Sequence, residues 1–227
     1  MRKSFPLIGS VLPRLVFCLA ALCCAAGLYS AAALAANFPT PAGWRADSFR
    51  FPLAFAPSIP YDGTQSVRFA PTFARFGTPA GFTHVVLWDI KPEPLEGTQL
   101  ERAIAVYLDG LMDNVARGRK LDELPVPAAV NLHPMGKPAG WDDAYAGTVH
   151  TWNAFSRGEE LRIEIEATTR RCAPDHLQVL LAMSMASRRD AAWRALREVR
   201  AATTCEAPAP PAGTSENPAG SPDKPGS

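Results

Sequence analysis

The segment 161–168 alternates apolar and polar side chains more regularly than any other part of the chain, and it limits the fold most strongly. Successive side chains of a strand point to opposite faces of a sheet, so a two-residue period predicts a strand with one buried and one polar face. Strands of this kind are typical of antiparallel sheets. The inward-facing set is Leu161, Ile163, Ile165 and Ala167, and the outward-facing set is Arg162, Glu164, Glu166 and Thr168.

Further strand patterns come in two runs, and each run is followed by a helix pattern. The first run has strands at about 49–55, 67–73 and 84–90, and the second has strands at 145–155, 161–169 and 177–185. The intervening segment 121–140, rich in Pro and Gly, is predicted to be an irregular connection. We therefore predict an α+β fold with an antiparallel sheet of about six strands in two runs, each run followed by a helix.

Both predicted helices begin with a capping-box pattern, a hydroxyl residue followed three positions later by a carboxylate. In the first, Thr98 precedes Glu101, the apolar stripe runs from Leu100, and Gly118 is the expected end. In the second, Ser187 precedes Asp190, and the helix is expected to run toward the C-terminal cysteine. Its buried stripe is predicted to consist of Ala192, Trp193, Leu196 and Val199.

The two ends of the chain differ in composition from the middle. Arg2, Lys3 and Arg14 precede a stretch without charge, residues 15–36, that contains the small-residue site Ala33-Leu34-Ala35, which is the pattern of a signal peptide. Residues 1–35 are thus the predicted signal, with cleavage after Ala35 or Ala36; an uncleaved membrane anchor is the alternative. Residues 36–43 are a predicted linker, 44–205 a single domain, and 206–227 a disordered tail rich in Pro, Gly and Ser.

Cysteine usage agrees with export to the periplasm or the extracellular space. Three of the five cysteines lie inside the predicted signal, which leaves Cys172 and Cys205 in the mature chain. An even pair in an exported protein predicts a disulfide, and two free thiols are the alternative. The bridge would close a loop of about 30 residues and contribute on the order of 3–4 kcal/mol in the chain-entropy model.

Charge and motifs exclude several functions. Without the three basic residues of the predicted signal, 20 basic and 22 acidic residues remain, so no strong field favours nucleic acid or an anionic membrane. The mature chain contains no GxSxG, HExxH, P-loop or GxGxxG motif. We therefore predict no cofactor, no stable membrane anchor after cleavage, and no catalytic or metal-ligating residue. The four histidines are scattered along the chain: His84, His133, His150 and His176.

One candidate binding face follows from strand register. If Gly158 adopts a left-handed conformation after a type I turn, Trp152 lies opposite Arg162 and His150 lies opposite Glu164, all on the outward face. A turn of two or four residues would instead place His150 and Trp152 in the core. The first register predicts a recognition platform of Trp, His, Arg and Glu. The alternative is that these polar residues pair with a helix that covers them.

The run FRFPLAFAPSIPYDGTQSVRFAP, the strand VVLWDI and the helix TQLERAIAVYLDGL resemble an uncharacterised family of small exported bacterial α+β proteins. The C-terminal pattern of Cys172, Trp193, Leu196 and Cys205 is similar as well. The resemblance covers most of residues 44–205 and implies no catalytic residues. The layout is also similar to PsbP-like and Mog1-like modules at the level of the fold alone.

Two function classes remain. We expect a non-catalytic cell-envelope protein that binds a protein partner or a small ligand on its sheet. The alternative is a hydrolase or metal-dependent enzyme whose site is assembled from distant residues. A pocket in which two titratable groups converge would favour the enzyme.

Overall fold

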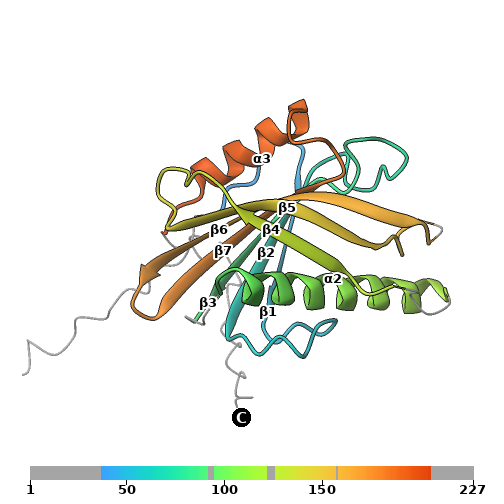
Figure 1. The fold of residues 1–227 in the computed structure, drawn as a ribbon, viewed down its shortest axis with the longest axis horizontal. Helices are drawn as coiled ribbons and strands as arrows, with labels where there is room; N and C mark the ends of the chain where they lie inside the picture. Colours follow the sequence, from blue (N-terminus) through green and yellow to red (C-terminus); the bar gives the residue numbers. More distant parts are fainter. Residues whose placement is uncertain (1–36, 92–94, 122–125, 157, 206–227) are drawn as a thin grey trace, which may run out of the picture. The chain divides into compact units, whose positions relative to one another are not determined.

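A computed structural model describes residues 37–91, 95–121, 126–156 and 158–205. The predicted signal peptide and the predicted tail lie outside these residues. Seven strands form one sheet, in which every neighbouring pair is antiparallel (Figure 1). Their order across the sheet is β1-β2-β3-β7-β6-β5-β4. The strands are β1 (Arg45–Arg50), β2 (Gly63–Phe69), β3 (His84–Ile90), β4 (Ala129–Pro134), β5 (Asp143–Trp152), β6 (Glu160–Ala173) and β7 (His176–Ser184).

The two helices lie on opposite faces of this sheet (Figure 1). Helix α2 (Thr98–Arg119) follows β3 and contacts β4 and β5, whereas α3 (Ala191–Ala202) follows β7 and contacts β7 and β3. The mixed, antiparallel architecture therefore agrees with the predicted class. The prediction of about six strands is wrong, because there are seven among the described residues. It also said nothing of the helices packing on opposite faces.

The additional strand is β4, which lies in the segment predicted to be irregular. Only Leu132 of its six residues is buried, so β4 lacks the apolar alternation that identifies a strand in sequence. It forms the edge of the sheet and pairs with β5 alone. An edge strand needs only one hydrogen-bonding neighbour. Proline lacks an N–H group and is tolerated in such a strand, and Pro134 occupies the last position of β4.

The first strand is displaced from its predicted position. Strand β1 ends at Arg50, and all six of its residues are exposed. The apolar residues that suggested a longer strand, Phe51 and Leu53, are buried in a loop that contains the cis peptide bond between Phe51 and Pro52. Alternating apolar residues therefore reached the core here without strand pairing.

Neither predicted capping box forms. Helix α2 begins at Thr98 after Gly97, and α3 begins at Ala191 after Asp190; neither N-cap position makes a side-chain hydrogen bond. The carboxylate of Glu101 instead accepts a hydrogen bond of 2.7 Å from the backbone N–H of Leu132 in β4. A tertiary contact has thus taken the place of the local one. Helix α2 also ends after Gly118, with Lys120 in the left-handed conformation.

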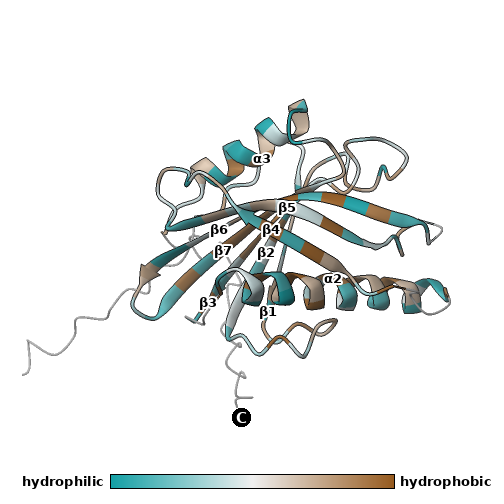
Figure 2. Ribbon diagram, in the orientation of Figure 1, coloured by the Kyte–Doolittle hydropathy of each residue, from teal (hydrophilic) through white to brown (hydrophobic). Residues whose placement is uncertain are grey.

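Each face of the sheet has its own apolar core, and the strands show the alternation as brown and teal bands (Figure 2). The core beneath α2 is the larger and includes Trp88, Val179 and Ile163. The core beneath α3 contains Leu87, Leu180 and the predicted helix residues Trp193, Leu196 and Val199. Strands β3 and β7 contribute to both cores, which explains their almost continuous apolar sequences.

The predicted disulfide is present. Cys172 at the end of β6 and Cys205 after α3 have Cα atoms 5.5 Å apart, within the range of ordinary bridges. Beside the bridge, Asn37 and Thr204 form two backbone hydrogen bonds of 3.1 and 2.9 Å. The segment after α3 is therefore connected to β6 covalently and to the start of the described chain by hydrogen bonds.

Candidate functional site

The predicted binding face lies on the α3 side of the sheet. His150, Trp152, Arg162 and Glu164 share this face, but the predicted pairs are wrong by two residues. His150 pairs with Arg162 and Trp152 with Glu160, because the connection is longer than a three-residue turn and Asn153 still hydrogen-bonds Glu159. Gly158 has the expected positive φ of 81°. A shift of two residues leaves every side chain on its original face.

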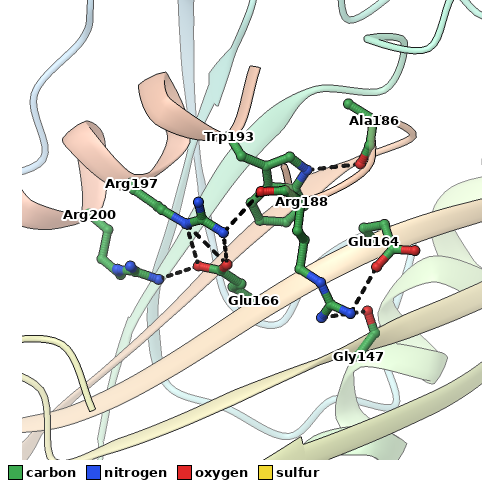
Figure 3. Close-up of polar contacts among 8 residues, drawn as sticks. All are labelled: Gly147, Glu164, Glu166, Ala186, Arg188, Trp193, Arg197 and Arg200. Atoms are coloured by element: carbon green, nitrogen blue, oxygen red, sulfur yellow. Dashed lines mark hydrogen bonds and ion pairs between the residues drawn. The ribbon is translucent and has the colours of Figure 1, made fainter. Parts of the chain in front are cut away.

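Glu164 and its neighbour Glu166 hold the α3 segment against the sheet (Figure 3). Glu166 is only 2% exposed, and its two carboxylate oxygens accept 2.6 Å hydrogen bonds from Arg197 and Arg200 of α3. Glu164 forms an ion pair of 3.1 Å with Arg188, in the connection before α3. Of the predicted platform, Glu164 therefore pairs with the segment that leads into α3, and Glu166, outside the platform, pairs with α3 itself.

Burial and nearby positive charge shift the pKa of Glu166 in opposite directions. Burial alone would raise the pKa of its carboxyl group, but the hydrogen bonds and positive charges of Arg197 and Arg200 outweigh burial and lower the pKa. The carboxylate is therefore ionised and paired at neutral pH. The ion pairs with Arg197 and Arg200 account for this buried charge, so no ligand is needed to balance it.

The remaining residues of the predicted face lie beyond α3. His150 is exposed and contacts Glu160 at 3.2 Å, and Arg162 contacts Glu164 at 3.2 Å. Trp152 is half-buried against the β5–β6 connection, where a Cβ atom on Gly158 would lie 2.7 Å from the indole nitrogen. The tryptophan thus packs on its own loop. A binding role for these residues stays a prediction.

A pocket lies on the opposite face, between the β1–β2–β3 side of the sheet and α2. Its volume is about 360 Å³. This is at the lower end of the range of about 300–1,000 Å³ that is usual for small-molecule sites. The lining residues come from β1 to β3, α2 and three loops: Arg45, Asp47, Phe49, Phe55, Gln65, Val67, Phe69, Phe73, His84, Tyr107, Leu111, Asn114, Val115 and Phe155.

Strand register aligns the sheet side of this pocket. Arg45, Asp47 and Phe49 alternate along β1 and pair with Phe69, Val67 and Gln65 of β2. Directly paired residues share a face, so this row of β1 lies on the α2 side of the sheet. All three β1 side chains are exposed, and Phe49 retains 41% of its accessible surface. Strand β1 therefore forms the open, partly charged side of the pocket.

Helix α2 forms the opposite wall. Tyr107, Leu111, Asn114 and Val115 recur at helical spacing and face the sheet or its rim. The loop after β1 lies directly against this helix (Figure 1), since a Cβ atom on Gly110 would lie 2.1 Å from the carbonyl oxygen of Phe55. Gly110 is thus required for this approach. It brings the rings of Phe55 and Tyr107 to 5.4 Å and closes one end of the pocket.

Aromatic rings close the other end. Phe73 packs edge-on against Phe69, with ring centroids 4.7 Å apart, and against Phe155, at 5.7 Å. Phe82 lies behind them, stacked on Phe73 at 5.3 Å. Edge-to-face contacts of this kind stabilise an aromatic cluster beyond the burial of its area. The end wall is consequently made of flat, rigid side chains.

Two buried polar side chains form the floor of this aromatic pocket. Gln65, 1% exposed, accepts a 3.1 Å hydrogen bond from the Trp88 indole and hydrogen-bonds the Tyr107 hydroxyl. His84, also 1% exposed, donates through Nδ1 to the carbonyl oxygen of Phe82 at 2.8 Å. Burial lowers the pKa of His84 to about 4, although the Phe82 bond opposes this shift. The imidazole is therefore neutral at physiological pH.

Sequence reasoning did not find this pocket. Phe49, Phe69 and Phe73 fell within predicted strands, and His84 was one of four scattered histidines without an assigned partner. One signal was available, although a weak one: a histidine opens the largely apolar strand β3, as another histidine opens β7. His84 lines a pocket because Phe73 and Phe155 lie together beside it, and only folding brings these two residues into contact.

Among residues 37–205, leaving out the undescribed gaps, no group of three or more His, Cys, Asp or Glu residues could hold a metal ion. In the same residues, no helix has the length and apolar character needed to cross a membrane. Compared with known proteins, the chain matches no family model, and no curated protein or solved structure shows significant similarity to it.

Proposed function

We propose that this chain is an exported, non-catalytic binding protein of the cell envelope, and that it binds a small, mainly apolar ligand in the pocket between α2 and strands β1–β3. The observation that carries the proposal is the combination of an open aromatic cavity with two buried polar groups in its floor. Apolar walls with a few convergent polar groups are the usual composition of a small-molecule site. The Cys172–Cys205 bridge supports export, since such bridges persist in oxidising compartments.

The chemistry of the lining favours binding over catalysis. Among the described residues that line the pocket there is no Ser, Thr, Cys or Lys to act as a nucleophile. The Nδ1 atom of His84 is already engaged by Phe82, and the two charged residues, Arg45 and Asp47, are exposed on the edge strand. A general acid and base acting on one substrate would need to converge in the same enclosed space.

The exposed rim also supports binding. Phe49 is one of the few large apolar side chains that remain exposed in the described residues. It stands beside the pocket opening, where a bound ligand would cover it. An apolar side chain at such a place is more informative than one scattered elsewhere on the surface, because it is contiguous with the apolar lining.

A fluorescent probe tests the proposal. Anilinonaphthalene sulfonate, titrated into the purified protein with its disulfide intact, is expected to bind at one site with a blue-shifted emission. Leu111→Trp fills the pocket and should abolish that binding. Val126→Trp is the matched control, because Val126 is 56% exposed and does not line the pocket.

Both variants must unfold cooperatively, with midpoints close to that of the original protein, so that loss of binding is not loss of folding. Absence of binding to the original protein, or equal binding to both variants, would contradict the proposal.

A further inference from the structure

The imidazole of His84 presents a hydrogen-bond acceptor to the pocket. Its Nδ1 lies 2.8 Å from the carbonyl oxygen of Phe82, and a carbonyl oxygen can only accept. The hydrogen is therefore on Nδ1, and in a neutral ring the lone pair is on Nε2. The lowered pKa of His84, caused chiefly by burial, is consistent with this neutral form.

Among the described residues, the rings nearest to the His84 imidazole carry no hydrogen-bond donor. Its neighbours are phenylalanines: Phe82 at 4.6 Å, Phe73 at 5.3 Å and Phe69 at 6.1 Å between ring centroids. Within the described part of the chain, the ring's hydrogen bond is the one through Nδ1. Nε2 is also absent from the described polar atoms that are sealed from solvent without a partner. Because Nδ1 is turned to the carbonyl oxygen of Phe82, Nε2 is the ring nitrogen left for the pocket that His84 lines.

In the unliganded pocket, water can donate to this acceptor, but an acceptor that nothing satisfies costs about 1–3 kcal/mol. A replacement by Phe would remove that cost, yet the chain places His at this position. A ligand that displaces this water therefore avoids the cost only if it brings a donor of its own. Gln65, the other polar group in the floor, is already satisfied by Trp88 and Tyr107, so Nε2 is the floor atom left to select the ligand.

The rings around Nε2 indicate the shape of that donor. Phe69 lies nearly parallel to the His84 ring, at 19°, whereas Phe73 and Phe82 present themselves edge-on. A flat aromatic ligand can continue these stacked and edge-to-face contacts. We propose that the ligand is a phenol, an aromatic molecule whose hydroxyl group donates a hydrogen bond to Nε2 of His84. This inference rests on the proposed function of the pocket.

The test compares two probes of nearly equal size, a naphthol and the methylnaphthalene with its methyl group at the same ring position. Both affinities are measured by fluorescence titration for the original protein and for His84→Phe. The ratio of naphthol to methylnaphthalene affinity is expected to fall about 3- to 10-fold in His84→Phe, the effect of one neutral hydrogen bond. His133→Phe, the same substitution at an exposed histidine outside the pocket, should leave the ratio unchanged.

A measurement on the original protein keeps the test independent of how His84→Phe folds. The nitrogen-15 resonance of Nε2 should move upfield when naphthol is added, and should not do so with methylnaphthalene. If both probes bind in a manner blocked by Leu111→Trp, but the ratio and the resonance do not change, the phenol assignment is overturned and the proposed function stands. If no probe binds, including anilinonaphthalene sulfonate, the result contradicts both the proposed function and the phenol assignment.

Discussion

Buried polar residues on the two faces of the sheet differ in how fully their hydrogen-bonding groups are satisfied. On the α3 face, the carboxylate of Glu166 is paired with two arginines of the covering helix. On the α2 face, the ring of His84 is bonded at one nitrogen and lines a cavity, where we propose that its other nitrogen accepts a hydrogen bond from a ligand. The first arrangement leaves nothing for a ligand to satisfy, and the second does. Buried polarity therefore indicates function only where the fold leaves it incompletely satisfied.

The difference has a geometric origin. Helix α3 lies over β3 and β7 in the middle of the sheet, and its arginines reach β6. Helix α2 contacts β4 and β5, while the inward row of the edge strand β1 stays exposed. The α2 face is thus incompletely covered on the β1 side. The pocket occupies that region. Changes on the α3 face should therefore alter how α3 packs on the sheet, and changes in the pocket should alter ligand binding.

The largest effect is expected from breaking the ion pairs on the α3 face. Glu166→Ala leaves the buried guanidinium of Arg200 without a partner, and removal of one member of a buried pair costs about 3–5 kcal/mol. Urea denaturation measures the loss, and Glu160→Ala, which removes an exposed carboxylate, should change stability by less than about 0.5 kcal/mol. Because the pKa of Glu166 is lowered in the folded state, its contribution should also disappear below its ordinary value of 4.5. Equal costs for the two variants would contradict the role of the pair.

The disulfide is expected to have the next largest effect. Replacement of Cys172 and Cys205 together by Ala removes a link that spans 33 positions, for a loss of about 3–4 kcal/mol in the chain-entropy model. The bridge lies after α3, so hydrogen exchange should increase first in α3 and not in α2. Unchanged stability, or increased exchange confined to α2, would show that the bridge does not secure the α3 face.

A pH effect of similar or smaller size should come from the α2 face. Because burial lowers the pKa of His84 from 6.5 to about 4, the unfolded chain binds this proton more readily than the folded chain. The resulting stability is fully present above pH 6.5 and is lost as the pH falls toward 4, by on the order of 3 kcal/mol. His84→Phe should flatten the profile of unfolding free energy between pH 7 and 5. A profile identical to that of the original protein would contradict the burial of a neutral ring.

The smallest effects on stability should give the clearest separation of the faces. Phe49→Ala, at the pocket rim, should cost less than about 1 kcal/mol in stability but weaken probe binding. Trp152→Ala, on the α3 face, should leave probe binding unchanged. If Trp152→Ala weakens binding and Phe49→Ala does not, the binding face is the one that strand register first suggested, and the pocket is only a gap in packing.

The sequence alone determined the features that depend on local periodicity. The two-residue alternation of Leu161, Ile163 and Ile165 placed Arg162 and Glu164 on the opposite face, and the strand at 84–90 was predicted with its observed bounds. The pairing of Cys172 with Cys205 followed from counting cysteines after the predicted signal. Such a pattern can be recognised from neighbouring residues alone, because successive side chains of a strand point to opposite faces of the sheet.

Only the tertiary structure decided what covers each face and what remains open. Glu101 bonds β4 and does not cap its helix, and β4 itself exists because β5 offers an edge to pair with. The same holds for the pocket, whose walls at Phe49, Tyr107 and Phe155 are far apart in sequence. Periodicity reports which side chains share a face, but a cavity depends on how far two packed elements diverge. That distance is set by contacts such as Gly110 against Phe55, which no local pattern encodes.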